Sequence, residues 1–390
     1  MRGKLCRDFS LDSVAPGFDA FCISANAQPK RPGRRLSLWP MAAILLGALA
    51  AVNPFYHPHI PPRIGYAAWL ADLALAIVCL MCPPLARAGV MGCGLFLAAP
   101  CLLHARPLLR AFLMCLSFLP LLVAALPLLK PSITDARSRL YFLMSWLGTR
   151  ELKRRPRSFQ AAALLQFAAA ALVFAVMIAS VRAVPASGLW FAPRWLAGGS
   201  MVFAFAEMAT AFHNFLTGLM GLAAPGLMNS PVLATSIGGF WTERWNPAAS
   251  VFFRKSCYEP LARHGKVQAL FAAFFVSGVV HLLLAYMALG RWGIAVACGT
   301  FFVVQPLLIL IERRMNVRRW RPATARVWTL AALAVACPLF IEPTLQVIAP
   351  NLQAGGPASL TAAMVVFVAL MTGFFAAFSL LAVRVETVKK

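Results

Sequence analysis

The run from Phe271 to Gly290, FAAFFVSGVVHLLLAYMALG, decides the fold class of this chain. A helix needs roughly 20 mostly apolar residues to cross the hydrocarbon core of a bilayer. This run has that length, and its one basic side chain is His281, near the middle. The run therefore predicts a membrane-spanning helix that carries a histidine at membrane depth.

Composition extends this prediction to the whole chain. Of its 390 residues, 61% are hydrophobic and 12% are charged, about half the charged share of a soluble domain. One soluble core cannot bury that much apolar surface in a chain of this length. We therefore predict an all-α integral membrane protein with about ten transmembrane helices. The expected spans lie near 38–54, 64–82, 88–104, 109–129, 159–181, 196–223, 267–287, 292–311, 327–348 and 359–383.

The basic residues predict the orientation. The formal net charge is +24, but Lys and Arg form short clusters between apolar runs, which is typical of membrane topology signals rather than of nucleic-acid binding. With ten spans and a cytoplasmic N-terminus, most of the 36 basic residues lie in the cytoplasm. We expect both termini there, a basic cytoplasmic tail at 1–36, a membrane domain at 37–390, and the inner membrane of a bacterium as the location. The basic residues left on the opposite side are Arg63, Arg106, Arg110, Arg182, Arg194 and Arg291.

Neither the cysteines nor the loop 130–158 predicts a site with its own chemistry. Cys79 and Cys82 have C-x-x-C spacing without a second pair, so we expect no disulfide framework and no metal site. The loop combines aromatic and basic residues, which favours either a helix lying beside anionic lipid headgroups or a topology signal with an amphipathic spacer.

The segment from Met228 to Lys266 is more informative: MNSPVLATSIGGFWTERWNPAASVFFRKSCYEPLARHGK. Basic residues alternate with aromatic residues, and Trp241 and Trp245 are four apart, so on a helix they share a face. One interpretation is an interfacial helix anchored by tryptophans. The other is a binding surface at the start of the motif-bearing region 228–287.

His281 favours the second interpretation. Ionisable groups at membrane depth are costly and usually face a cavity or a partner. Burial in hydrocarbon disfavours the imidazolium, so we expect a neutral ring. A neutral imidazole can accept a proton, as a general base must.

An ordered set of motifs resembles a known family. The block S-x-x-x-F-W-T-E-R-W-N at 236–246, then Arg254, Tyr258-Glu259-Pro260 and a histidine in the following helix, resembles the membrane-bound O-acyltransferases, most closely their wax synthase branch. The resemblance covers 230–286. Thr242 and Glu243 replace the Gly-Arg of the usual wax synthase block. The resemblance implies a buried catalytic chamber and acyl transfer from acyl-CoA, a co-substrate rather than a bound cofactor, to a hydroxyl.

The family pattern implies roles for individual residues. His281 is the expected catalytic histidine, and Asn246 is expected to orient a substrate or donate to an oxyanion; alternatively, Asn246-Pro247 only ends a helix. Basic side chains of the block are expected to pair with CoA phosphates, or to be solvated or lipid-facing charges. Independently of the family pattern, burial of a charge in the sixth span indicates that Glu207 either lines the acceptor side or is a structural hydrogen-bonding residue. The expected substrate-binding residues are Trp241, Arg244, Trp245, Arg254, Lys255, Tyr258 and Glu207.

Three functional hypotheses follow. The first is a membrane O-acyltransferase that esterifies a lipophilic alcohol with an acyl group from acyl-CoA. The second, in the same family, is acetylation of a polyketide, terpenoid or glycan hydroxyl. The third is a proton-coupled transporter in which Glu207 and His281 relay protons, although no internal repeat supports it.

Overall fold

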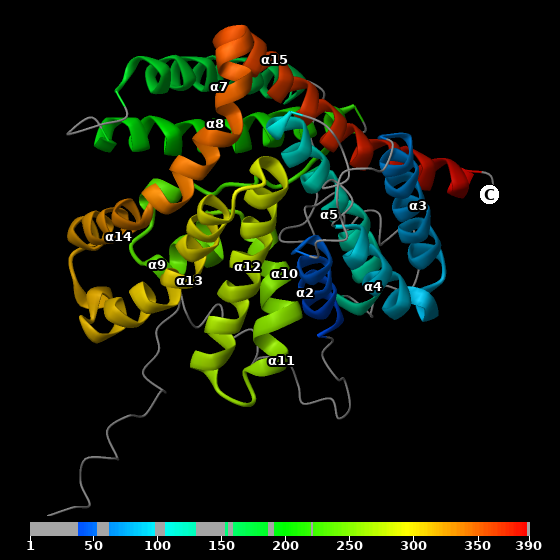
Figure 1. The fold of residues 1–390 in the computed structure, drawn as a ribbon, viewed down its shortest axis with the longest axis horizontal. Coiled ribbons are helices and arrows are strands. Elements are labelled where there is room, and N and C mark those ends of the chain that lie inside the picture. Colours follow the sequence, from blue (N-terminus) through cyan, green and yellow to red (C-terminus); the bar gives the residue numbers. More distant parts are fainter. Residues whose placement is uncertain are drawn as a thin grey trace, which may run out of the picture.

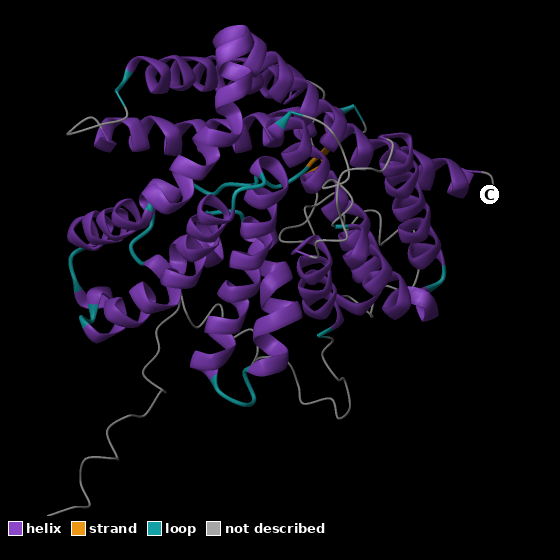
Figure 2. Ribbon diagram, viewed as in Figure 1, coloured by secondary structure: helices purple, strands orange, loops and turns teal. Residues whose placement is uncertain are grey.

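The computed structural model describes residues 38–52, 62–97, 106–129, 153–154, 159–185, 191–219 and 221–387. These residues are almost all helical (Figures 1 and 2). The longer helices are α2 (Trp39–Val52), α3 (Pro62–Met81), α4 (Ala86–Phe96), α5 (Pro107–Leu129), α7 (Phe159–Ala183), α8 (Phe191–Gly218), α12 (Lys266–Leu289), α13 (Trp292–Arg314), α14 (Pro322–Ala336) and α15 (Pro338–Thr387). The expected tail 1–36 and nearly all of the loop 130–158 lie outside the described residues.

Six described helices are long and apolar enough to cross a bilayer. They contain the spans Pro107–Ala125, Gln160–Ala183, Ala192–Gly218, Lys266–Leu289, Trp292–Arg314 and Pro338–Leu370, and two shorter apolar helices cover Trp39–Ala51 and Pro322–Ala336. The prediction of a multi-pass helical membrane protein is confirmed. The count of ten spans is not confirmed.

The C-terminal helices divide at other positions than the sequence predicted. The expected ninth span, 327–348, is interrupted at Cys337, where α14 has ended and α15 begins. The loop expected between 348 and 359 is mostly helical, because membrane helices tolerate internal prolines such as Pro350 and Pro357. Only Gly356 leaves the helical conformation, with φ 67° and ψ −173°, and it divides α15 into two parts.

Helices α12 and α13 approach each other closely through two facing glycines. A Cβ atom on Gly278 would lie 2.8 Å from the carbonyl oxygen of Gly299, and one on Gly299 would lie 3.0 Å from that of Gly278. Small residues let membrane helices pack with their backbones near each other. One turn beyond these glycines, His281 and Phe302 stack with ring centroids 3.8 Å apart. The close packing therefore positions the intramembrane histidine.

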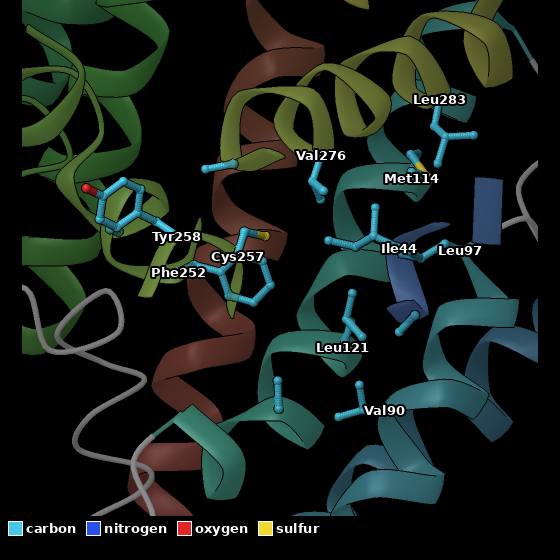
Figure 3. Close-up of a cluster of buried hydrophobic side chains, with 14 of the residues drawn as sticks. Ile44, Val90, Leu97, Met114, Leu121, Phe252, Cys257, Tyr258, Val276 and Leu283 are labelled. Carbon is cyan, nitrogen blue, oxygen red and sulfur yellow. The ribbon is translucent and has the colours of Figure 1, made fainter. Parts of the chain in front are cut away.

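The two largest of four hydrophobic clusters hold most of the described helices together. The first joins α2, α4, α5 and α12 to residues 228–265, called the motif segment below. Figure 3 shows members of this cluster, including Ile44, Met114, Phe252 and Val276. The second packs α7 and α8 against α15 and the start of α5. The motif segment is thus part of the first core and does not lie apart on the surface.

Polar residues of α8 fix the chain that leads into the motif segment. The Thr210 hydroxyl accepts a hydrogen bond from the Leu227 N–H at 3.0 Å, and the Asn214 side chain accepts one from the Ala224 N–H at 2.8 Å. Nearby, the two-residue strands β1 (Lys153–Arg154) and β2 (Leu222–Ala223) pair antiparallel. These bonds satisfy backbone donors that would be costly to leave unpaired in an apolar surrounding.

Candidate active site

A pocket opens where the motif segment meets α12 and α13. The space that it encloses, together with the part open to solvent, is about 750 Å³. Apolar and aromatic side chains form most of the wall, with a few polar groups among them. The lining residues are Gly238, Trp241, Thr242, Trp245, Asn246, Ala249, Ser250, Phe253, Leu270, Ala273, Phe274, Ser277, His281, Phe302 and Ile309. This composition is typical of a small-molecule site. The two expected catalytic residues, Asn246 and His281, both line it.

His281 has one ring nitrogen engaged. Nδ1 lies 2.8 Å from the carbonyl oxygen of Ser277, one turn earlier in α12. A carbonyl can only accept, so Nδ1 carries the proton in this contact, and in the neutral ring Nε2 then has a free lone pair. Phe302 stacks on one face of the ring, and Phe340 meets it edge-on at 5.9 Å. These contacts fix both the tautomer and the ring plane.

Asn246 begins a helix, directly after a helical turn that ends at Arg244 with Trp245 as its C-cap. Its backbone is left-handed (φ 45°, ψ 66°), and its side-chain oxygen accepts a hydrogen bond from the Ala249 N–H at 3.1 Å. It is therefore the N-cap of α10 (Pro247–Phe253), with proline at the first helical position. Because the oxygen is used for capping, the side-chain NH2 group is the part of Asn246 that can donate to a ligand.

The segment between Ile237 and Tyr258 contains two turns of π-helix. A short α-helical turn, α9 (Ile237–Gly239), continues into η5 (Phe240–Arg244), and α10 continues into η6 (Arg254–Tyr258). In the first, the Trp245 N–H donates to the Phe240 carbonyl at 2.7 Å. Such turns are rare and are frequent near functional sites. They are not the regular helix assumed for Trp241 and Trp245.

Both tryptophans are partly buried and pack against the first hydrophobic cluster. Trp241 contacts the rings of Phe274, Phe301 and Phe302 at 5.6 to 6.0 Å, and its indole N–H donates to the Gln305 side chain at 3.0 Å. Trp245 stacks on Phe240 with centroids 5.5 Å apart. Both side chains line the pocket, so they form a wall between the motif segment and the two spanning helices.

The expected phosphate-binding side chains lie outside the pocket lining. Arg244 donates to the backbone carbonyls of Asn229 and Ser230 at 3.2 and 3.1 Å. Arg254 forms an ion pair with Glu259 at 2.8 Å, in which both side chains are mostly buried. Lys255 is half-buried in η6. In the described part of the chain, Arg244 and Arg254 therefore stabilise the motif segment itself.

Tyr258 and Glu207 also lie outside the pocket lining. Tyr258 is only 1% exposed and belongs to the first hydrophobic cluster (Figure 3). Glu207 accepts a hydrogen bond from Gln166 of α7 at 3.0 Å.

Beside Tyr258, burial raises the pKa of the Cys257 thiol to about 11, and the hydrogen bond with Ser256 lowers that pKa by a smaller amount. That thiol is protonated near neutral pH and is a poor nucleophile.

Two buried polar residues of α13 were not expected from the sequence. Gln305 is fully buried and bonds to Trp241, and Glu312 accepts a hydrogen bond from the Ile237 N–H at 2.6 Å. A glutamine within an apolar run and a carboxylate at its end are the signals that indicate them. Glu312 thus connects α13 to the start of α9, and Gln305 connects α13 to η5.

Glu312 predicts a stability effect. Glu312→Ala leaves the Ile237 N–H unpaired in a buried place, which costs about 1–3 kcal/mol, so we expect a lower thermal unfolding midpoint for the purified protein. Glu312→Gln keeps an acceptor oxygen and is expected to lose much less. Equal losses in the two variants would show that the hydrogen bond to α9 is not what Glu312 contributes.

The fold and the pocket define a multi-pass helical membrane protein with a mostly apolar pocket between the motif segment and two candidate spanning helices, α12 and α13. Residues 224–304 match the family model described as "Membrane bound O-acyl transferase family". This confirms the resemblance seen in the block at 236–246 and in His281. The matched range includes every pocket-lining residue except Ile309.

Curated relatives agree with this family. The chain is 30% identical over 147 residues to a protein named "Probable long-chain-alcohol O-fatty-acyltransferase 2" from Arabidopsis thaliana, covering 34% of this chain and 42% of the relative. It is 29% identical over 140 residues to "Probable long-chain-alcohol O-fatty-acyltransferase 8" from the same plant, covering 33% of this chain and 41% of the relative. It is 31% identical over 121 residues to "Acyl-CoA--sterol O-acyltransferase 1", covering 27% and 34%. The matches thus span less than half the length of these plant proteins.

Proposed function

We propose that the protein is an acyl-CoA-dependent O-acyltransferase that esterifies a lipophilic alcohol. The observation that carries the proposal is that His281 and Asn246, from two separate segments, line one apolar pocket. The names of the plant relatives, which refer to long-chain alcohols and to sterols, support an alcohol of this class. The mostly apolar wall supports it independently, because a hydrocarbon chain is favoured there over a polar substrate.

His281 and Asn246 divide the chemistry. The Nε2 lone pair of His281 takes the proton of the alcohol as its oxygen attacks the thioester carbonyl carbon. The Asn246 NH2 group donates a hydrogen bond to the carbonyl oxygen as it becomes negative. When the tetrahedral intermediate collapses, the carbon–sulfur bond breaks and the imidazolium returns its proton to the CoA thiolate. The products are an ester and free CoA, and the histidine is neutral again.

The position of Glu207 favours this proposal over proton-coupled transport. A relay between Glu207 and His281 needs both groups, or a polar connection between them, along one pathway. Glu207 pairs with Gln166 between α7 and α8, whereas His281 of α12 lines the pocket. In Figure 1, α7 and α8 lie along one side of the bundle, and α12 and α10 lie together on another side. The proposal also retains the orientation with both termini in the cytoplasm, which gives acyl-CoA access from that side.

The proposal is tested with the purified protein in lipid nanodiscs. We expect labelled palmitoyl-CoA and hexadecanol to give palmityl palmitate and one free CoA thiol per ester. Acetyl-CoA in place of palmitoyl-CoA examines the acetylation hypothesis. Ester formation with acetyl-CoA but not with palmitoyl-CoA would show that the donor is a short-chain acyl-CoA. Transport of either substrate without covalent change would refute acyl transfer.

A further inference from the structure

Gln305 is a polar side chain in an apolar, buried place. It lies in α13 with no exposed surface. Its side-chain oxygen accepts the hydrogen bond from the Trp241 indole at 3.0 Å, and its NH2 group donates to the Phe301 carbonyl at 2.9 Å. Burying an amide without partners is costly, so these two bonds make one arrangement of Gln305 and Trp241 strongly preferred.

Trp241 connects Gln305 to the pocket. Its indole forms part of the pocket wall and lies 5.6 Å from the ring of Phe302. Phe302 in turn stacks on His281. Gln305 follows Phe302 by three residues, so both lie on one face of α13. This face therefore supports the indole and the catalytic imidazole together, while Gln305 itself lies outside the pocket lining.

We propose that Gln305 is a positioning residue that holds the Trp241 indole in the pocket wall and so determines the length of hydrocarbon chain that fits beside His281. This rests on the proposed acyl transfer. Without the hydrogen bond, only its ring contacts hold the indole, and it can turn into pocket space that a long chain needs. The affected ligand is a linear hydrocarbon chain, which belongs either to the acyl donor or to the alcohol.

Gln305→Leu removes the acceptor at similar volume. We expect kcat/KM for palmitoyl-CoA relative to octanoyl-CoA to fall about tenfold, the size of effect that a lost buried hydrogen bond produces. A second series, with octanol and hexadecanol at fixed palmitoyl-CoA, identifies whether the donor or the alcohol lies against the indole. Gln346→Leu makes the same chemical change in α15, where Gln346 accepts from Arg291 at 3.4 Å, and is expected to leave both ratios unchanged.

Trp241→Phe removes the donor of the same hydrogen bond and covers the case in which Gln305→Leu fails to fold. If Gln305 acts through the indole, the double variant shows the chain-length ratio of Trp241→Phe alone. Unchanged ratios in Gln305→Leu, or equal losses of kcat on all chain lengths, would overturn the proposal.

A binding readout separates this proposal from acyl transfer itself. Palmitoyl-CoA and hexadecanol that carry a diazirine at the chain end label residues next to the bound chain on illumination, with or without turnover. We expect labelling of the pocket segments in the parent, and a shifted labelling pattern in Gln305→Leu. A shift without any ester formation would retain the positioning role and refute the proposed function. Ester formation with identical labelling in parent and variant would refute the positioning role and retain the proposed function.

Discussion

Replacing His281 with alanine is expected to lower kcat for ester formation by about 10³-fold, within the range that a general base contributes. His281 is the basic group in the pocket lining, and its Nδ1 bond to the Ser277 carbonyl leaves Nε2 to accept the alcohol proton. KM for the alcohol is expected to change little, because the apolar wall that binds the chain remains. Release of CoA thiol from palmitoyl-CoA in the presence of hexadecanol measures the effect.

His264→Ala is the matched control. His264 is exposed beyond α11 (Glu259–Leu261) and accepts a hydrogen bond from Arg263 at 2.9 Å. It is expected to retain parental turnover. Substantial turnover in purified, folded His281→Ala would remove the general base from the mechanism, even if the protein remained an acyltransferase.

The sequence predicted the parts of the site that depend on local chemistry. A histidine within an apolar run is unusual wherever the helix lies in the fold, so His281 was recognisable without any contact information. The segment before it, Met228 to Lys266, was recognisable because its basic residues alternate with aromatic residues. The structure places Trp241 and Trp245 in the lining of the same pocket as His281, because the motif segment packs on α12 and α13.

Contacts over long sequence separations could not be predicted in the same way. Gln305 bonds to Trp241 across 64 positions, and Glu312 bonds to Ile237 across 75. Each residue resembles an isolated polar group in or beside an apolar run until the packing of α13 is known. Similarly, the spans expected at 327–348 and 359–383 left a connection between them, whereas in the structure Pro350 and Pro357 lie inside α15 and Gly356 has the non-helical backbone there.

Asn246 combines a local role with a proposed catalytic one, and two substitutions separate them. Asn246→Asp keeps an oxygen that caps α10 and a residue type that tolerates the left-handed backbone. It removes the NH2 donor and adds negative charge beside the developing oxyanion. We expect kcat to fall by about 10²–10³-fold, as when one oxyanion donor is lost, with a nearly parental unfolding midpoint.

Asn246→Gly removes the donor without adding charge, and glycine keeps the left-handed conformation at a small capping cost. A similar loss of kcat in both variants would therefore come from the missing NH2 group and not from electrostatic repulsion. Asn316 has the same backbone conformation, with φ 54°, and begins η7 (Val317–Arg319) outside the pocket lining. Asn316→Asp is expected to retain turnover. Parental turnover in folded Asn246→Asp would mean that Asn246 only starts α10, and the oxyanion donor would then have to be another polar group of the pocket, such as Ser250.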